Sequence, residues 1–278
     1  MATALAGQHA IVIGGGSGLG LGSARLLARD GAAVTIAGRT EQKLRDAAAE
    51  LADEGLAVKW VRCDALDGDS VRAAVDAASV DGKLHIGVVV PGGGSISPVL
   101  LYGDDQFSEE VDKNVRPVFL LLKYAGRAMV RAGGGSFVAI SSTAAAFSCR
   151  YLASYGAGKA AVDHLVDIAA DELGAAGVRV NSVRPGMTRT AATAGAFANE
   201  AMMAEFLAGQ AIPRNGEVDD IAQAVRYLAG PESSWVTGQH LAVDGGHTLR
   251  AFVDYAKLLD LPDVRTDPSV VSHRAIPR

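Results

Sequence analysis

The stretch that decides the fold reads A-I-V-I-G-G-G-S-G-L-G, from Ala10 to Gly20. Its four leading apolar residues predict a strand buried on both faces, and the glycines let the chain turn tightly into a helix over Leu19–Arg29. In such a turn the backbone can approach a pyrophosphate, which the free N–H groups and the positive dipole end of the helix then hold. Flexible turns also collect glycines, but this position between strand and helix favours a dinucleotide site.

The spacing of these glycines is not the strict G-x-G-x-x-G. Gly14, Gly18 and Gly20 fit G-x-x-x-G-x-G instead. The cofactor contacts predicted in this segment are Gly14, Gly16, Ser17, Gly18, Leu19 and Gly20.

The end of the second predicted strand indicates which dinucleotide is bound. An acidic residue there binds the ribose 2′-OH of NAD, whereas an arginine accommodates the 2′-phosphate of NADP. Here Gly38 leaves room, Arg39 offers a fork of donors and Thr40 follows, so we predict NADP(H). The alternative is that Arg39 is an ordinary exposed arginine. After the third strand, Asp64 and Ala65 are predicted to contact the adenine, unless Asp64 only caps the next helix.

Apolar, β-branched runs alternate with amphipathic stretches along the rest of the chain. Further strands are expected at Ala33–Ala37, Ala57–Val61, Ile86–Val90, Ser136–Ile140, Val178–Val183 and His240–Val243. Further helices are expected at Glu41–Asp53, Ser70–Ala78, Asp105–Arg131, Ala153–Ala175 and Val218–Leu228. This alternation predicts an α/β fold: a single doubly wound, Rossmann-type domain with about seven parallel strands and helices on both faces of the sheet.

Two regions depart from the alternation. A long connection, 185–212, contains a short predicted helix at Glu200–Leu207 and is expected to border the substrate. We therefore predict one cofactor-binding domain over 1–248 that includes this substrate loop. The remaining segment, 249–278, begins as a possible amphipathic helix and ends rich in proline. It is either a surface appendage or an arm that packs on a neighbouring subunit.

Composition excludes several classes of function. Hydrophobic residues make up 49% and charged residues 21% of the 278, which fits a well-buried globular domain. A net charge of -5 without a dense basic block argues against nucleic acid or an anionic membrane as partners. Met1–His9 lacks the basic start of a secretory signal, so a cytoplasmic location is expected. Cys63 and Cys149 are expected to be reduced thiols, and no metal-ligand spacing is found.

Tyr155 and Lys159 carry the chemistry. On a helix, residues four apart share one face, so the Lys159 ammonium would favour the phenolate and lower the pKa of Tyr155. A phenol with a lowered pKa can donate and accept a proton near neutral pH. A lone Tyr-Lys pair on a helix is more often a solvated face, so the surrounding motifs decide the interpretation.

The order of these motifs resembles the short-chain dehydrogenase/reductase family, of the Tyr-x-x-x-Lys type. The similarity extends from Gly7 to Gly246 and includes the glycine segment, Asp64, Asn114, Ser142, Tyr155, Lys159, Pro185-Gly186 and Val243–Gly246. Ser142 stands 13 residues before Tyr155, as in the family pattern. The adjacent Ser141 is the alternative oxygen ligand, and the spacing favours Ser142.

The resemblance implies an NAD(P)-dependent oxidoreductase that moves hydride between its cofactor and a carbonyl or secondary alcohol. Tyr155 would be the general acid or base, Ser142 would bind the substrate oxygen, and Lys159 would hold the nicotinamide ribose. Asn114 would anchor a water on a proton path to Lys159. Further implied cofactor contacts are Gly92, Pro185, Gly186, Thr188 and Thr190. The resemblance also implies a homotetramer, with the two long predicted helices as its interface.

Three departures from the family pattern stand near the site. Ile13 replaces a threonine, the family's Asn-Asn-Ala-Gly reads Val89-Val90-Pro91-Gly92, and Gly156 and Gly158 stand between Tyr155 and Lys159. The altered stretch at Val89–Gly92 motivates an alternative hypothesis, a cofactor-binding sensor or assembly subunit with little activity. The expected substrate is apolar or partly apolar, with an acyl thioester, a steroid or terpenoid ketone and a small aliphatic ketone left open.

Overall fold

A seven-stranded sheet forms the centre of the molecule in the computed structural model, which describes residues 3–250 and 255–261. The strands are β1 (His9–Ile13), β2 (Ala33–Gly38), β3 (Lys59–Arg62), β4 (Ile86–Val89), β5 (Gly135–Ile140), β6 (Val178–Pro185) and β7 (His240–Val243). All six strand pairs are parallel, in the order β3-β2-β1-β4-β5-β6-β7. The predicted fold class is confirmed.

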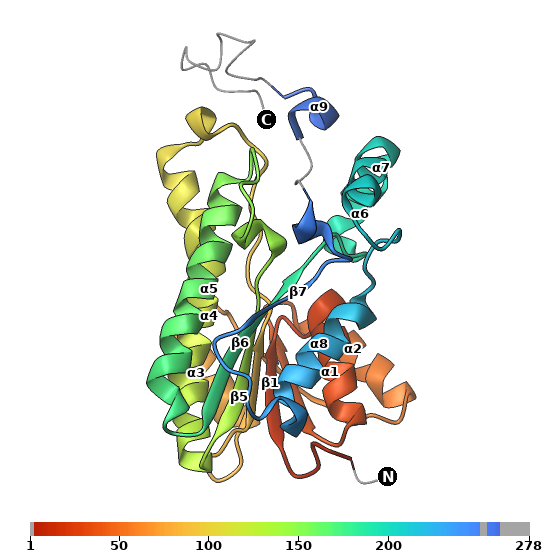
Figure 1. The fold of residues 1–278 in the computed structure, drawn as a ribbon. Helices are drawn as coiled ribbons and strands as arrows, with labels where there is room; N and C mark the ends of the chain where they lie inside the picture. The colour runs from red at the N-terminus through yellow and green to blue at the C-terminus, as the bar shows by residue number, and fades with distance from the viewer. Residues whose placement is uncertain (1–2, 251–254, 262–278) are drawn as a thin grey trace.

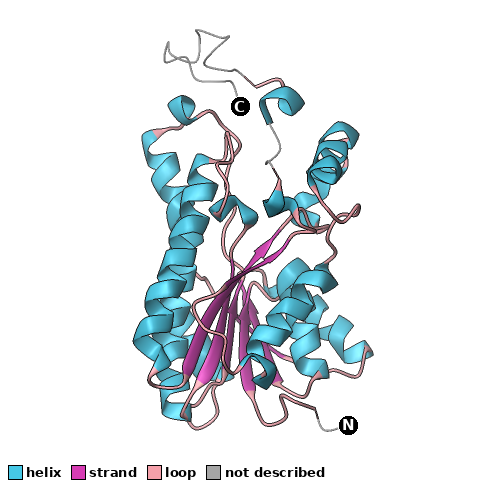
Figure 2. Ribbon diagram, in the orientation of Figure 1, coloured by secondary structure: helices cyan, strands magenta, loops and turns pink. Residues whose placement is uncertain are grey.

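Helices cover both faces of the sheet (Figure 2). They are α1 (Gly18–Arg29), α2 (Glu41–Asp53), α3 (Gly68–Ala78), α4 (Asp104–Ala132), α5 (Ala153–Gly174), α6 (Ala194–Phe197), α7 (Glu200–Gly209), α8 (Val218–Ala229) and α9 (Tyr255–Leu259). Helices α1, α2 and α8 form one core with the sheet, and α3, α4 and α5 form the other. Among the described residues, no helix is both long enough and apolar enough to cross a bilayer.

Up to residue 248, every predicted strand and helix is present with its ends within two residues of the prediction. For two of these ends, the structure gives the physical reason for the difference from the prediction. Strand β3 begins at Lys59 rather than Ala57 because it lies at the edge of the sheet and pairs only with Thr35–Gly38. Helix α3 begins at Gly68 rather than Ser70 because the Asp67 carboxylate accepts from the backbone N–H of Ser70 and caps the helix.

The segment that opened the sequence analysis forms a tight strand-to-helix turn. A Cβ at Gly20 would lie 2.2 Å from the carbonyl oxygen of Gly14, so only glycine lets α1 pack this closely on the end of β1. The side chain of Ser17, at the N-cap position of α1, makes no capping hydrogen bond. The first turn of the helix therefore presents its N–H groups at the end of the sheet.

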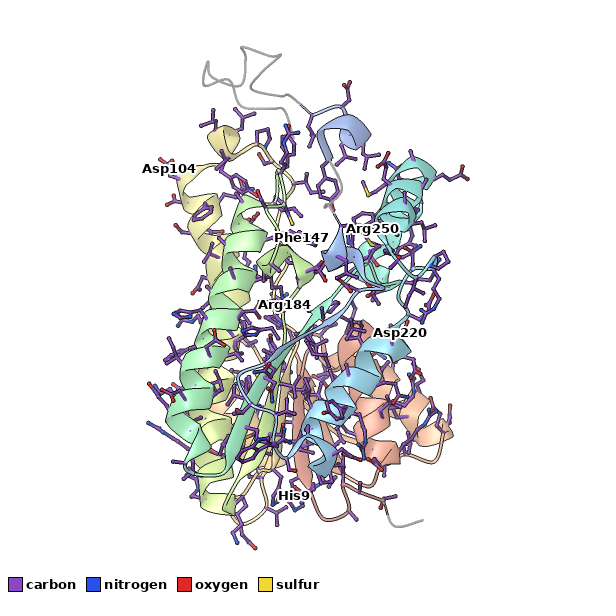
Figure 3. The ribbon with its side chains drawn as sticks, in the orientation of Figure 1. His9, Asp104, Phe147, Arg184, Asp220 and Arg250 are labelled. Atoms are coloured by element: carbon purple, nitrogen blue, oxygen red, sulfur yellow. The ribbon has the colours of Figure 1, made fainter. Side chains whose placement is uncertain are left out.

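The carboxyl ends of the strands gather the segments that border the site. Strands β1 and β4 are neighbours, and successive crossovers lead away from them in opposite directions, which places the ligand crevice of a doubly wound sheet at their ends. Helices α6, α7 and α9 lie beyond this end of the sheet (Figure 1). In Figure 3, His9 marks the opposite end of β1, and Phe147 and Arg250 lie beyond the carboxyl ends.

The C-terminal segment differs from the expected amphipathic helix. Leu249 ends a short 3-10 turn, His247–Leu249, and α9 begins at Tyr255. Of the other residues predicted on that helix face, Ala256 lies in α9, and Phe252 and Val253 lie outside the described residues.

Candidate active site

Two adjoining cavities lie at the carboxyl ends of the strands. The larger, about 650 Å³, extends over the ends of β1, β2, β3 and β4. The smaller, about 470 Å³, lies between the ends of β5 and β6, the start of α5 and the substrate loop. Gly14, Val90 and Pro91 line both cavities, so together they form one crevice across the end of the sheet.

Most of the residues predicted from the sequence line this crevice. The larger cavity is lined by Gly14, Arg39, Asp64, Ala65 and Gly92. The smaller is lined by Ser17, Gly18, Leu19, Ser142, Tyr155, Lys159, Pro185, Gly186, Thr188 and Thr190. Four predicted residues, Gly16, Gly20, Thr40 and Asn114, line neither cavity.

Tyr155 and Lys159 lie one turn apart on the first turns of α5, as the spacing predicted. The Lys159 ammonium lies 5.5 Å from the centre of the Tyr155 ring. The two serines differ in their surroundings: the Ser142 hydroxyl accepts from the backbone N–H of Ala144 and interacts with Tyr155, whereas Ser141 donates to the carbonyl of Lys159. Of the pair, Ser142 is therefore the one beside the phenol.

The Lys159 side chain is buried, with only 2% of its surface exposed. Its ammonium donates to the carbonyl oxygens of Pro91 and Ile140, both at 3.0 Å. Burial lowers the pKa of Lys159 to about 7, although the Asp163 carboxylate one turn further along α5 acts to raise it. The ammonium thus connects the ends of β4 and β5 beside the phenol.

The pKa of Tyr155 differs from the sequence-based expectation. Burial raises this pKa above its usual value of 10, and the interaction with Ser142 only partly offsets the effect. The expectation was a pKa lowered by Lys159. Burial wins because removing the phenolate from water is costly, and because the nearby ammonium is itself desolvated and donates to two carbonyls.

Asn114 lies behind the crevice rather than on its surface. Its amide donates to the carbonyl of Gly93 at 2.9 Å and to the carbonyl of Glu110 at 2.8 Å. Two glycines make room for it: a Cβ at Gly92 would meet the Asn114 amide oxygen at 1.8 Å, and a Cβ at Gly158 would meet the Asn114 Cβ at 2.8 Å. Asn114 therefore holds the turn after β4 and lets α4 and α5 approach closely.

Of the two alternatives left open near the adenine end, the structure decides only whether Asp64 caps α3, and the role of Arg39 stays a prediction. Asp64 accepts from the backbone N–H of Leu66 at 3.0 Å and does not cap α3, because Asp67 occupies the cap position. Arg39 is exposed at the end of β2 and lines the larger cavity.

The sequence analysis missed two contributors to the site. Glu110 borders the larger cavity beside the turn after β4. Tyr255 of α9 lines the smaller cavity, with its ring 6.5 Å from that of Phe206 on α7. The signal for Tyr255 was one aromatic residue in a possible amphipathic helix, and a single buried acid on a long amphipathic helix gives no periodic signal.

The comparisons with known proteins agree with this geometry. A family model described as enoyl-(acyl carrier protein) reductase matches residues 14–248. A solved structure of a short-chain type dehydrogenase/reductase from Mycobacterium ulcerans superimposes with a TM-score of 0.89 at 41% identity, over 92% of this chain and 94% of the other. The chain is a short-chain dehydrogenase/reductase.

Other relatives of this dehydrogenase/reductase carry named activities. Cis-4-hydroxycyclohexanecarboxylate dehydrogenase of Sinomonas cyclohexanicum is 38% identical, over 89% of this chain and 99% of the relative. A 7α-hydroxysteroid dehydrogenase, solved with NADH and 7-oxo glycochenodeoxycholic acid, superimposes with a TM-score of 0.83 at 32% identity, over 88% and 96% of the two chains. The prediction of an NAD(P)-dependent oxidoreductase acting on carbonyl or alcohol groups is confirmed.

The residues of this dehydrogenase/reductase fit a nicotinamide dinucleotide. The turn after β1 brings the first N–H groups of α1 to the crevice, where a pyrophosphate can accept from them. The crevice continues from there to Arg39 on one side and to Tyr155 on the other, so an extended ligand can lie across the sheet.

Proposed function

We propose that this enzyme uses NADP(H) to interconvert a ketone and a secondary alcohol, with Tyr155 as the proton donor and acceptor. The observation that carries the proposal is the grouping of Ser142, Tyr155 and Lys159 in one cavity that adjoins the glycine turn. When bound, the cofactor supplies or accepts hydride at its nicotinamide ring.

In the direction of reduction, the protein's own groups manage the substrate oxygen. Ser142 donates to this oxygen and Tyr155 transfers its phenolic proton to it as negative charge develops there. The Lys159 ammonium lies near the Tyr155 ring and stabilises the phenolate that results. Met187, Thr188 and Thr190 border the same cavity and are proposed to position the nicotinamide end of the cofactor.

The preference for NADP(H) rests on the end of β2. Arg39 is exposed beside Gly38 at the wall of the larger cavity, where its guanidinium can pair with a 2′-phosphate. Titration of the protein with NADPH and NADH tests the proposal, and at least tenfold tighter binding of NADPH is expected. Equal or tighter binding of NADH would refute the role of Arg39 and leave the reaction class intact.

The walls of the smaller cavity favour an apolar substrate. Its apolar surface comes from Ala144, Leu152, Met187, Phe206 and Tyr255. Two of the relatives described above act on ring alcohols, so we propose a cyclic ketone or alcohol as the substrate class. A panel of cyclic and open-chain ketones assayed with NADPH measures this, and a preference for open-chain ketones would count against it.

The role of Tyr155 is tested by the Tyr155→Phe variant. Loss of the phenolic proton is expected to lower kcat by about 10²–10⁴-fold, the usual contribution of general acid-base catalysis, with NADPH affinity unchanged. Unchanged turnover would remove Tyr155 from its proposed role.

We also propose that the enzyme is a homotetramer. Phe119 and Val130 on α4 and Ile168 on α5 are exposed large apolar residues beside a hollow of about 470 Å³ between the two helices. A second copy of this face would cover them. Light scattering of the eluting protein measures the assembly, and a monomeric or dimeric mass would contradict the tetramer. The cytoplasmic location stays a prediction from the sequence.

A further inference from the structure

A buried carboxylate lies between the turn after β4 and the start of α5. Glu110 belongs to α4, and only 8% of its surface is exposed. Its position is four residues before Asn114, whose amide donates to the Glu110 backbone carbonyl. The side chain of Glu110 points away from that bond, toward Ser95 and Ser154.

Both carboxylate oxygens of Glu110 accept hydrogen bonds from this turn, and one of them also accepts from α5. The Oε2 atom accepts from the Ser95 backbone N–H at 3.0 Å and from the Ser154 hydroxyl at 2.5 Å. The Oε1 atom accepts from the Ser95 hydroxyl at 2.5 Å and from the Gln106 amide at 3.2 Å. Tyr102 adds a further link, since its hydroxyl donates to the Ser95 carbonyl at 2.8 Å and lies 3.2 Å from the Ser154 hydroxyl.

The carboxylate is ionised over the whole range in which an enzyme is assayed. Burial alone would raise the pKa of Glu110, but the hydrogen bonds from Ser154, Ser95 and Gln106 outweigh burial and lower it to about 2. Hydrogen bonds to a charged acceptor are stronger than those between neutral groups. The hydrogen bonds to the Glu110 carboxylate therefore hold the turn and α5 together more strongly than hydrogen bonds between neutral groups would.

This connection ends directly beside the phenol. Ser154 immediately precedes Tyr155 on α5. On the other side, the turn lies against the tyrosine itself, because a Cβ at Gly94 would meet the Tyr155 Cβ at 2.8 Å. A shift of the turn or of the first residues of α5 would therefore move the phenol.

We propose that the Glu110 carboxylate is a positioning residue, which holds the turn at Gly92–Ser95 and the start of α5 together and so fixes the place of Tyr155. The proposal rests on Tyr155 being the proton donor of the proposed reaction.

The main test compares Glu110→Leu with a matched control, Glu109→Leu. Glu109 is the neighbouring acid on α4, is exposed, and makes only a 3.7 Å surface ion pair with Lys113. For Glu110→Leu we expect kcat to fall at least tenfold while the Kd for NADPH changes less than threefold. Glu109→Leu should match the wild type. Glu110→Gln, which keeps an oxygen that can accept from Ser95 and Ser154, should recover most of the kcat.

A merely structural role gives a different pattern. If kcat of folded Glu110→Leu stays within threefold of the wild type, or if kcat and NADPH affinity fall together in proportion to the unfolded fraction, the proposal is overturned. Should Glu110→Leu fail to fold, Ser154→Ala takes its place, because it removes a single donor. It is expected to lower kcat at least threefold, and an unchanged kcat would count against the proposal.

A second measurement does not depend on turnover. In protein labelled with ¹³C at the tyrosine ζ carbon, the Tyr155 signal is assigned by its loss in Tyr155→Phe. The signal is expected to shift in Ser154→Ala and in folded Glu110→Leu, to shift less in Glu110→Gln, which keeps an acceptor, and to stay in place in Glu109→Leu. Superimposable Tyr155 signals in all variants would overturn the positioning role of Glu110, even if the proposed reaction is correct. If the signal shifts but the wild-type protein shows no turnover, the positioning role stands and the proposed function is wrong.

Discussion

At the scale of single residues, the charge on Lys159 depends on groups that do not border the crevice. Asp163, one turn after Lys159 on α5, is buried and acts to raise the pKa of the ammonium. The Asp163 carboxylate accepts from the Arg184 guanidinium and the Ser182 hydroxyl, both at 2.7 Å, and lies 3.4 Å from His240. Polar contacts therefore run from the edge of the sheet at β7 to Asp163, whose charge acts on the ammonium beside the phenol.

Replacing Asp163 with asparagine is expected to lower the pKa of Lys159 further below its value of about 7, because burial then acts without the opposing carboxylate. If the proposed role needs the charged ammonium, the loss of kcat/KM at high pH should begin about one unit lower in this variant. Asp167→Asn is the control, since Asp167 is exposed and contacts His240 and His164 rather than Lys159 among the described residues. A pH profile identical to that of the wild type would separate Asp163 from the chemistry.

At the scale of elements, the close approach of α4 and α5 depends on one glycine. Gly158 faces Asn114, whereas Gly156, half a turn away on the same helix, would place a Cβ 3.4 Å from the carbonyl of Ala144. Alanine is intrinsically better than glycine inside a helix by about 0.5–1 kcal/mol, so the two positions differ only in their surroundings.

The Gly158→Ala variant is expected to destabilise the protein by about 1–3 kcal/mol, because the new methyl overlaps the Asn114 side chain at 2.8 Å. Gly156→Ala should be neutral or stabilising by up to about 1 kcal/mol. Urea unfolding of the two variants measures the difference. Equal stability would show that α4 and α5 separate without cost.

Helix α9 contributes an aromatic side chain to the wall of the smaller cavity, where the substrate is proposed to bind. Tyr255 is buried, and it packs in one cluster with Tyr151, Met202, Met203 and Phe206, all from the segments around that cavity. The Tyr255→Ala variant is expected to raise KM for a cyclic ketone about tenfold and to leave the Kd for NADPH unchanged. Trp235→Ala, at a side chain that is 99% exposed, is the control. If KM does not change, α9 is not part of the substrate wall.

At the scale of the whole molecule, the sequence predicted the alternating strands and helices and the spaced motifs. It missed single side chains that reach the site from distant segments. Apolar runs alternating with amphipathic ones predict the doubly wound parallel sheet, and the glycine turn and the Tyr155–Lys159 spacing locate the crevice on that sheet. Spacing alone does not report burial, so the direction of the Tyr155 pKa was wrong. Glu110 and Tyr255 reach the site only through the packing of distant segments, which leaves no periodic trace in the sequence.

The acid stability of the molecule also depends on Glu110. Its pKa is lowered from the usual 4.5 to about 2 in the folded state, so its contribution is complete above pH 4.5 and is lost as the pH falls toward 2. Between these values, the free energy of unfolding of the wild type should fall by up to about 3 kcal/mol more than that of Glu110→Gln. Chemical unfolding at a series of acid pH values measures this, and parallel curves would contradict it.

The hydrogen bonds around Glu110 also limit which substitutions this sequence can accept during evolution. A change at Ser154 alone removes a donor from a buried carboxylate, and a change at Glu110 alone leaves the Ser95 N–H and two hydroxyls without their acceptor. Lineages are therefore expected to gain or lose the acid and its donors together. Relatives with an apolar residue at the position of Glu110 should also lack hydroxyls at the positions of Ser95 and Ser154, and should hold their tyrosine in place by other contacts.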